Sequence, residues 1–117
     1  MKINVISYIL AVIFLLSGGA KLAGLEFELV AFERWGYPIW FMYITGIAEV
    51  SGGVALAANI LRRYAAPSLA LLMVGAIATH VRHSEWPMLM IALVIFSLAV
   101  VLSVSLWKSS HTSEIIQ

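Results

Sequence analysis

The stretch PIWFMYITGIAEVSGGVALAANIL, from Pro38 to Leu61, decides the fold of this chain. It is long enough to cross a bilayer as a helix, because a spanning helix needs about 20 mostly apolar residues. Glu49 is its only charged residue. A carboxylate at bilayer depth is costly, so such residues usually face a protein interior or a water-filled cavity and mark functional sites. Glu49 is therefore the first candidate for a functional residue.

The composition of the whole chain agrees with a membrane protein. Of its 117 residues, 62% are hydrophobic and 11% are charged, and a soluble domain of this size has too little interior to hide so much apolar surface. The charges gather within residues 21–34, 62–63 and 82–85. The apolar stretches between them predict transmembrane helices at about residues 4–22, 39–61, 66–81 and 87–108.

We therefore expect an all-α fold, a four-helix transmembrane bundle. Residues 1–108 form one four-span membrane domain, and residues 109–117 form a polar C-terminal tail that frays. Between the first two spans, apolar and charged side chains alternate over residues 25–35 in a pattern that predicts a short amphipathic helix at the membrane interface. The first apolar segment is interpreted as a retained helix and not a signal peptide, because its apolar part is long and Lys21 follows it directly.

The chemistry and orientation of the chain are bounded by its charges and by the residue types it lacks. There is no cysteine, which excludes disulfides and thiol chemistry, and a net charge of +1 predicts no nucleic-acid partner.

Four spans place both termini on one side, and the positive-inside rule predicts the cytoplasmic side of an inner membrane. That side carries one more basic residue than the other: Lys2, Arg62, Arg63 and Lys108 against Lys21, Arg34 and Arg82.

A polar site around Glu49 is predicted from helical spacing. Residues three and four apart share a helix face, and the face of Glu49 is narrow because it holds glycines and a threonine. Glu49 lies about 15 Å along its helix, so a direct ion pair from Lys21 would need a long reach or a tilted helix. We expect a polar funnel that descends to it from the helix ends. The candidate ligand-binding residues are Glu49, Lys21, His80, Thr45, Ser17 and Arg82.

Structural roles are the alternatives for these residues. Glu49 is either a ligand group or a buried carboxyl that holds helices together, and Lys21 is either a site residue or a lysine that snorkels to the interface. Arg82 also fits an interface anchor. His80 and His83 have the spacing of a metal-binding pair, but no further ligands accompany them, so no metal site is predicted and haem ligation has no more support.

The chain resembles the DoxX-like family of small four-helix membrane proteins. The resemblance is carried by residues 14–22 (FLLSGGAKL), residues 36–38 (GYP), residues 46–53 (GIAEVSGG) and the pair Thr79–His80, and it covers nearly the whole chain. It implies a four-helix transmembrane bundle with Lys21, Glu49 and His80 at its polar centre. The family is named after a subunit linked to thiosulfate:quinone oxidoreductase chemistry, while other members are associated with oxidative-stress complexes or with channel assembly.

Three functions follow from these observations. The first is a membrane binding or accessory protein whose pocket at Glu49 holds a lipid, a quinone or a polar residue of a partner helix, serving as a redox-complex subunit or an assembly factor. The second is an oxidoreductase subunit that passes electrons to quinone. The third is a small proton-coupled exporter, a class of protein with a similar length, four spans and one essential glutamate. A bound quinone or lipid, the bilayer, a membrane-protein partner and a second copy of the chain are the expected ligands and partners.

Overall fold

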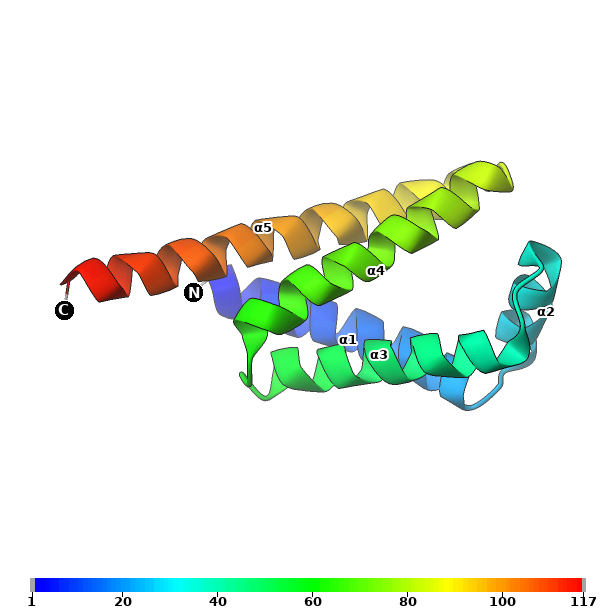
Figure 1. Ribbon diagram of the computed structural model, residues 1–117, viewed down its shortest axis with the longest axis horizontal. Helices are drawn as coiled ribbons and strands as arrows, with labels where there is room; N and C mark the ends of the chain where they lie inside the picture. The colour runs from blue at the N-terminus through cyan, green and yellow to red at the C-terminus, as the bar shows by residue number, and fades with distance from the viewer. Residues whose placement is uncertain (1, 117) are drawn as a thin grey trace.

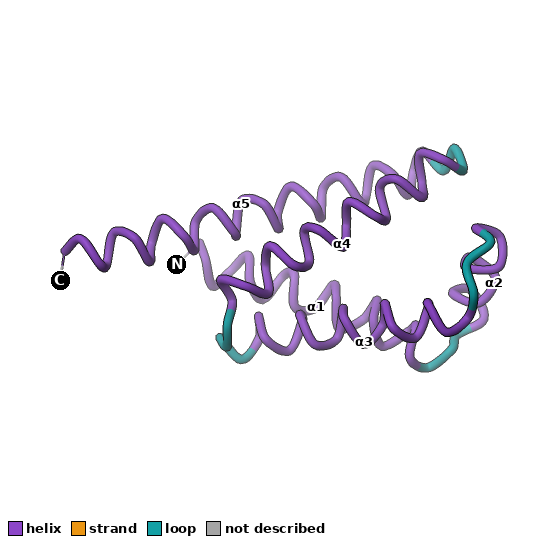
Figure 2. The backbone as a smooth tube through the Cα atoms, in the orientation of Figure 1, coloured by secondary structure: helices purple, strands orange, loops and turns teal. Residues whose placement is uncertain are grey.

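The computed structural model describes residues 2–116, with side chains to residue 109, and every secondary-structure element in that range is a helix. Figure 1 and Figure 2 show α1 (Lys2–Leu22), α3 (Ile39–Ala57), α4 (Arg62–Arg82) and α5 (Trp86–Ile116) running along one long axis. The short α2 (Glu26–Trp35) lies across one end of them. The four long helices are each apolar enough to cross a membrane. The predicted all-α architecture, four spans plus a short helix between the first two, is confirmed.

The helices pack as two pairs. Helix α1 lies against α3, and α4 lies against α5, while the two pairs are closest near the chain termini and diverge toward α2 (Figure 1). Near the termini, a continuous apolar core joins the pairs through Leu10, Phe14, Leu56, Leu69 and Leu102. Because the pairs diverge at the other end, the site described below lies between them there.

Helices α1 and α3 meet backbone to backbone. A Cβ added at Gly18 would lie 2.8 Å from the carbonyl oxygen of Gly46, and one at Gly53 would lie 2.9 Å from Leu15 Cγ. Small residues let helices approach closely in lipid, where dispersion and polar contacts drive their association. The glycine-rich face predicted around Glu49 is thus the face that receives α1. Gly52 instead receives Leu69 of α4.

The turn between α3 and α4 ends α3 earlier than expected. Residues 39–61 were predicted to be helical, but the helix ends at Ala57, and Asn59 and Leu61 adopt positive φ angles of 56° and 52°. The buried Arg62 guanidinium then donates from Nε to the carbonyl oxygen of Leu56 at 2.8 Å. A cation at a helix C-terminus satisfies its free carbonyls and opposes the helix dipole, which stabilises this early end.

Helix α4 begins earlier than predicted and contains Pro67 in its first turns. A proline lacks the N–H that would bond to the carbonyl four residues back, here that of Arg63. The indole Nε1 of Trp107 donates to that carbonyl oxygen at 3.2 Å. The freed acceptor therefore gains a partner from α5, and the helix continues through the proline.

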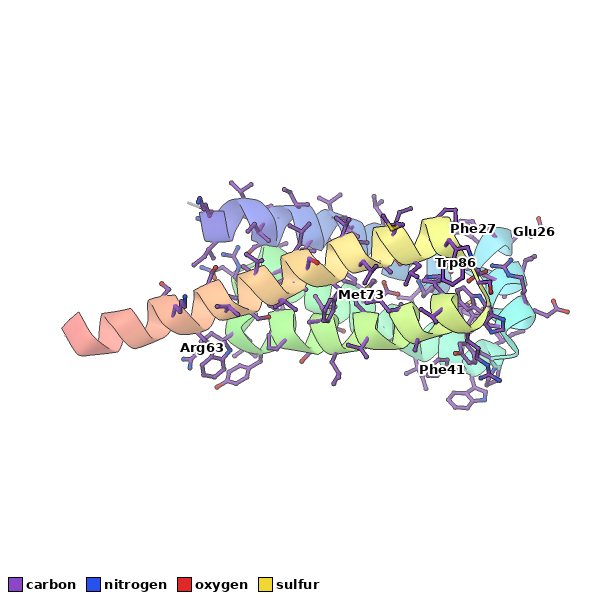
Figure 3. All side chains as sticks on the ribbon, turned by 90° about the horizontal axis from the view of Figure 1, so that it is seen from above. Glu26, Phe27, Phe41, Arg63, Met73 and Trp86 are labelled. Atoms are coloured by element: carbon purple, nitrogen blue, oxygen red, sulfur yellow. The ribbon has the colours of Figure 1, made fainter. Side chains whose placement is uncertain are left out.

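Helix α5 also extends beyond its predicted end. The backbone is helical to Ile116 and protrudes past the other helices (Figure 1). The division into a membrane domain to residue 108 and a polar tail from residue 109 stays a prediction. Of the four long helices, α5 buries the smallest share of its apolar window, as expected for the helix most exposed to lipid. Figure 3 shows that Arg63 lies toward the terminal end of the bundle, whereas Glu26, Phe27 and Trp86 lie at the α2 end and Met73 between them.

Candidate functional site

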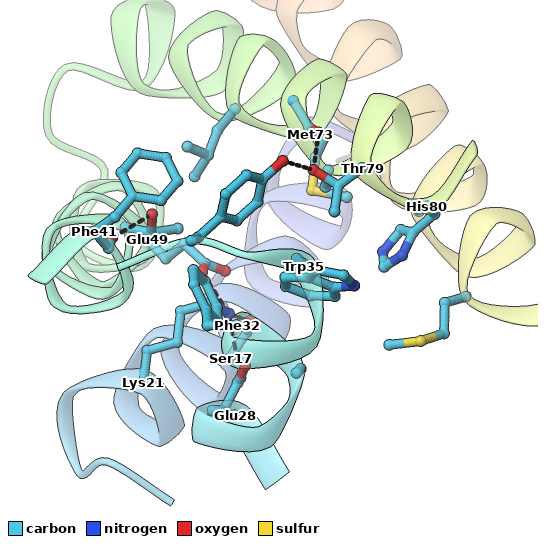
Figure 4. A pocket seen from close by; sticks show the side chains of 18 of the residues that line it. Ser17, Lys21, Glu28, Phe32, Trp35, Phe41, Glu49, Met73, Thr79 and His80 are labelled. Atoms are coloured by element: carbon cyan, nitrogen blue, oxygen red, sulfur yellow. Dashed lines mark hydrogen bonds and ion pairs between the residues drawn. The ribbon is translucent and has the colours of Figure 1, made fainter. Parts of the chain in front are cut away.

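A cavity of about 790 Å³ lies between the two helix pairs beside α2, and residues of α2 line it. All five helices contribute to its lining, and most of the lining side chains are apolar or aromatic. Figure 4 shows Glu49 and Lys21 on one side of this space and Thr79 and His80 on the other. The cavity is therefore an apolar chamber with polar groups on opposing walls. Its aromatic lining consists of Phe14, Phe27, Phe32, Trp35, Tyr37, Trp40 and Phe41.

The first polar group is a buried cluster around the Lys21 ammonium. Its Nζ lies 2.8 Å from Glu49 Oε1, 3.2 Å from Glu28 Oε2 and 2.9 Å from Ser17 Oγ. The side chains of Lys21 and Glu28 are each 11% exposed and that of Glu49 is 7% exposed. Burial of these charges is tolerated because each carboxylate faces the same cation.

The direct ion pair between Lys21 and Glu49 corrects the expectation drawn from depth alone. Because α1 and α3 are antiparallel and touch at Gly18 and Gly46, a Cβ at Gly46 would lie only 2.9 Å from Lys21 Cβ. Lys21 is therefore level with a residue one helical turn from Glu49, and its flexible stem spans that turn. No unusual tilt or long reach is needed.

The second polar group joins α2 to the turn between α4 and α5. Glu85 Oε1 accepts hydrogen bonds from Trp35 Nε1 and His80 Nδ1, each at 2.9 Å, while Oε2 accepts one from Arg34 Nε at 3.0 Å. Burial raises the pKa of the Glu85 carboxyl, but the hydrogen bonds from His80, Trp35 and Arg34, together with the charge of Arg34, outweigh burial and hold that pKa below its ordinary value. Glu85 is therefore an ionised anchor.

A third contact crosses the cavity between the segment after α2 and α4. The Tyr37 hydroxyl lies 2.8 Å from Thr79 Oγ1, and the Thr79 hydroxyl donates to the carbonyl oxygen of Gly75 at 2.9 Å. Since that bond uses the single Thr79 proton, Tyr37 is the donor to Thr79. Gly36 ends α2 with a φ of 81°, a left-handed conformation suited to glycine, and turns the chain so that Tyr37 reaches α4.

Five of the predicted site residues line this cavity: Ser17, Lys21, Thr45, Glu49 and His80. The Thr45 hydroxyl donates to the carbonyl oxygen of Phe41 in its own helix. Arg82 does not join them, because it is exposed and lies two residues beyond His80, which places it about 200° around the helix. The interface-anchor interpretation fits its position. The described residues bring no three histidine or acidic side chains together as a metal site would require.

The sequence reasoning missed Glu28 and Glu85, which complete the two charged clusters. Both lie outside the spans, among other charged residues. The energetic cost of placing a charge in the membrane therefore gave no reason to select them. Spacing offered a weak signal, since Glu85 follows His80 by five residues and Glu28 follows Lys21 by seven.

The fold and the cavity together define a small four-span membrane protein with a charged chamber at one end of its bundle. The chain belongs to the DoxX-like family, whose sequence profile matches residues 5–102. It is also similar to a Bacillus subtilis (strain 168) protein named "Uncharacterized protein YdgD", with 32% identity over 93 residues, which covers 75% of this chain and 82% of the relative. No solved structure matches the chain significantly.

Proposed function

We propose that this protein is a membrane-embedded binding protein whose cavity holds an amphipathic small molecule, lipid-like or quinone-like, and that it serves as an accessory subunit for other membrane proteins. One observation carries the proposal: a cavity of about 790 Å³ opens onto a buried carboxylate and ammonium within the spans. A charge cluster needed only for packing would not require such a space beside it.

The dimensions and lining of the cavity support this function. Small-molecule sites are mostly apolar pockets of about 300–1,000 Å³ with a few placed polar groups. Here the aromatic side chains would receive the apolar body of a ligand, and Glu49 or His80 would receive its polar head. A molecule dissolved in the bilayer has the required amphipathic character.

The test is native mass spectrometry of protein released from membranes in mild detergent. The variant Glu49→Gln keeps the shape of the side chain and removes its charge, and Glu33→Gln makes the same change on the exposed face of α2. We expect a copurifying molecule in the wild type and in Glu33→Gln, and its loss in Glu49→Gln. The absence of a bound molecule in the wild type and in both variants would contradict the proposal and favour a structural role for Glu49.

A quinone-linked redox subunit is the second candidate, favoured by the position of His80. His80 Nδ1 lies 2.9 Å from an oxygen of the ionised Glu85, and this contact orients the ring and leaves Nε2 for a ligand. A histidine on one wall and a carboxylate on the other would suit the two hydroxyl groups of a reduced quinol.

Decylubiquinol and decylubiquinone can test this candidate through the fluorescence of Trp35, which lines the cavity. We expect the quinol to quench more strongly, and His80→Phe to remove the difference. Equal, unsaturable quenching by both would contradict it. Crosslinking in native membranes then separates the accessory roles: recovery with a dehydrogenase supports a redox subunit, and recovery with unassembled membrane proteins supports an assembly factor.

A further inference from the structure

The polar groups of the cavity are unequal in charge, and this inequality bears on the ligand. Around Lys21, one ammonium faces two carboxylates, those of Glu28 and Glu49. At the other wall, Arg34 and Glu85 pair with one another and cancel. The cluster around Lys21 therefore carries one negative charge in excess. The remaining acidic residues of α2, Glu26 and Glu33, are exposed and do not line it.

The cavity is also short of free hydrogen-bond donors. The Lys21 ammonium has three N–H groups and three oxygens within 3.2 Å. On the opposite side the Trp35 indole donates to Glu85 and the Tyr37 hydroxyl to Thr79. The Arg34 guanidinium, which also lines the cavity, donates to Glu85 from Nε and Nη2, and its side chain is 49% exposed, so its remaining N–H groups are open to water. Thr45 donates to its own helix.

Acceptors remain free where the donors are used. The second carboxylate oxygens of Glu28 and Glu49 have no hydrogen-bond partner among the described residues. Both side chains line the cavity. A ligand whose head only accepts hydrogen bonds would therefore meet few partners, whereas a head rich in N–H groups would meet several.

The aromatic lining adds a third reason. The faces of Trp, Tyr and Phe attract cations, and a desolvated cation gains more from them than an exposed one. Phe32, Trp35 and Tyr37 lie close together, with ring centroids 5.1–6.1 Å apart. Figure 4 shows Phe32 and Trp35 between the carboxylates and His80. The cavity thus combines carboxylates and aromatic faces in the manner of sites for organic cations.

From these three observations we propose that the ligand of this cavity is an amphipathic ammonium, with a protonated amine at the carboxylates of Glu28 and Glu49 and an apolar body against the aromatic wall. The inference rests on the proposed binding function and names the ligand class for the same site. The ammonium would neutralise the excess charge and supply the donors that the walls lack.

Four probes with the same ten-carbon chain isolate each part of the proposal. Decylamine carries charge and N–H donors at neutral pH, decyltrimethylammonium carries charge alone, 1-decanol carries a neutral donor, and decylubiquinone carries acceptors. Each is titrated into detergent-solubilised protein by calorimetry, against the same titration into protein-free micelles. We expect decylamine to bind at least tenfold more tightly than 1-decanol, with decyltrimethylammonium between them and decylubiquinone weaker than decylamine.

Two charge-removing variants locate the site. Glu49→Gln and Glu28→Gln should each weaken decylamine binding at least tenfold and leave 1-decanol unchanged, and Glu33→Gln should change neither. Glu28 lies outside the spans, so its variant keeps the test decisive if Glu49→Gln fails to fold.

Binding of decylamine and 1-decanol with equal affinity, or tighter binding of decylubiquinone, would overturn the ammonium assignment while leaving the binding function intact. Equal affinity for decylamine and decyltrimethylammonium would overturn the role of the N–H donors. Absence of binding by every probe would overturn both the assignment and the binding function.

Discussion

At the scale of single residues, the Lys21 ammonium holds the charged cluster together. The variant Lys21→Met would leave Glu28 and Glu49 buried without their cation, and breaking a buried ion pair on one side costs about 3–5 kcal/mol. We expect a loss of this size in unfolding by a denaturing detergent. Lys108→Met, an exposed control, should change little.

The double variant Lys21→Met with Glu49→Gln sharpens this test. It removes both members of the closer pair, so most of the lost stability should return. If Lys21→Met alone were as stable as the wild type, the cluster would not exist as a set of ion pairs.

Two adjacent glycines provide a matched pair for the contact between α1 and α3. A methyl group at Gly18 would lie 2.8 Å from the Gly46 carbonyl oxygen, whereas one at Gly19 would meet nothing within 4 Å. Forcing a methyl into a packed interface costs about 1–3 kcal/mol. We expect Gly18→Ala to lower stability by this amount in the same unfolding assay and Gly19→Ala to leave it unchanged or raised. Equal effects would place the contact elsewhere.

The charged residues show how far the sequence predicts the site. Glu49 and Lys21 could be found because a charge within or beside a span is rare and needs a reason. Glu28 could not be distinguished from Glu26 and Glu33, since only the docking of α2 turns it inward and buries it. Arg82 was selected for its charge, but its helix phase turns it away from the cavity.

At the scale of secondary-structure elements, α2 covers one end of the cavity and is held by polar contacts in its first and its last turn. Glu28 binds it to α1 through Lys21, and Arg34 and Trp35 bind it to the turn after α4 through Glu85. Glu85 accepts the hydrogen bonds from both Arg34 and Trp35, so its charge determines how strongly the last turn of α2 is held. We expect Glu85→Gln to speed hydrogen–deuterium exchange of the α2 amides. Glu33→Gln, on the exposed side of α2, should not.

The lowered pKa of Glu85 makes the contact between α2 and Glu85 depend on pH. A carboxyl with a lowered pKa in the folded state stabilises that state fully above its unfolded pKa, and the stabilisation is lost as the pH falls through the lowered value. Exchange of α2 in the wild type should therefore accelerate below the ordinary pKa of glutamate. In Glu85→Gln that acceleration should be absent, and its persistence would assign the effect to another group.

Helix ends were predicted less well than helices, for local reasons. The length of the hydrophobic stretch predicted a helix as far as residue 61, but α3 ends at Ala57, where the Arg62 guanidinium bonds to the carbonyl oxygen of Leu56. Pro67 suggested a helix start, yet Trp107 provides the partner that allows α4 to begin at Arg62. In both cases the deciding contact comes from a residue whose position only the assembled bundle fixes.

At the scale of the whole molecule, the cavity and α2 lie at the end opposite the termini (Figure 1). The balance of basic residues predicts that the termini face the cytoplasm, so the cavity should lie toward the outer side. The absence of cysteine allows a clean test with single cysteines at Glu26 and Ser109. In intact cells, a membrane-impermeant maleimide should label Glu26→Cys and not Ser109→Cys. The reverse pattern would invert the orientation.

The contact between α1 and α3 also bears on how the chain is synthesised. Helix α3 holds a buried carboxylate within its span, and a charge at that depth makes the entry of this helix into a bilayer costly. Lys21 leaves the ribosome before Glu49. Helix α1, with its ammonium and with Gly18, would therefore already be at the translocon when α3 arrives. We therefore expect the first helix to act as an insertion partner for the third, so that the order of the two along the chain matters for how this membrane protein is built.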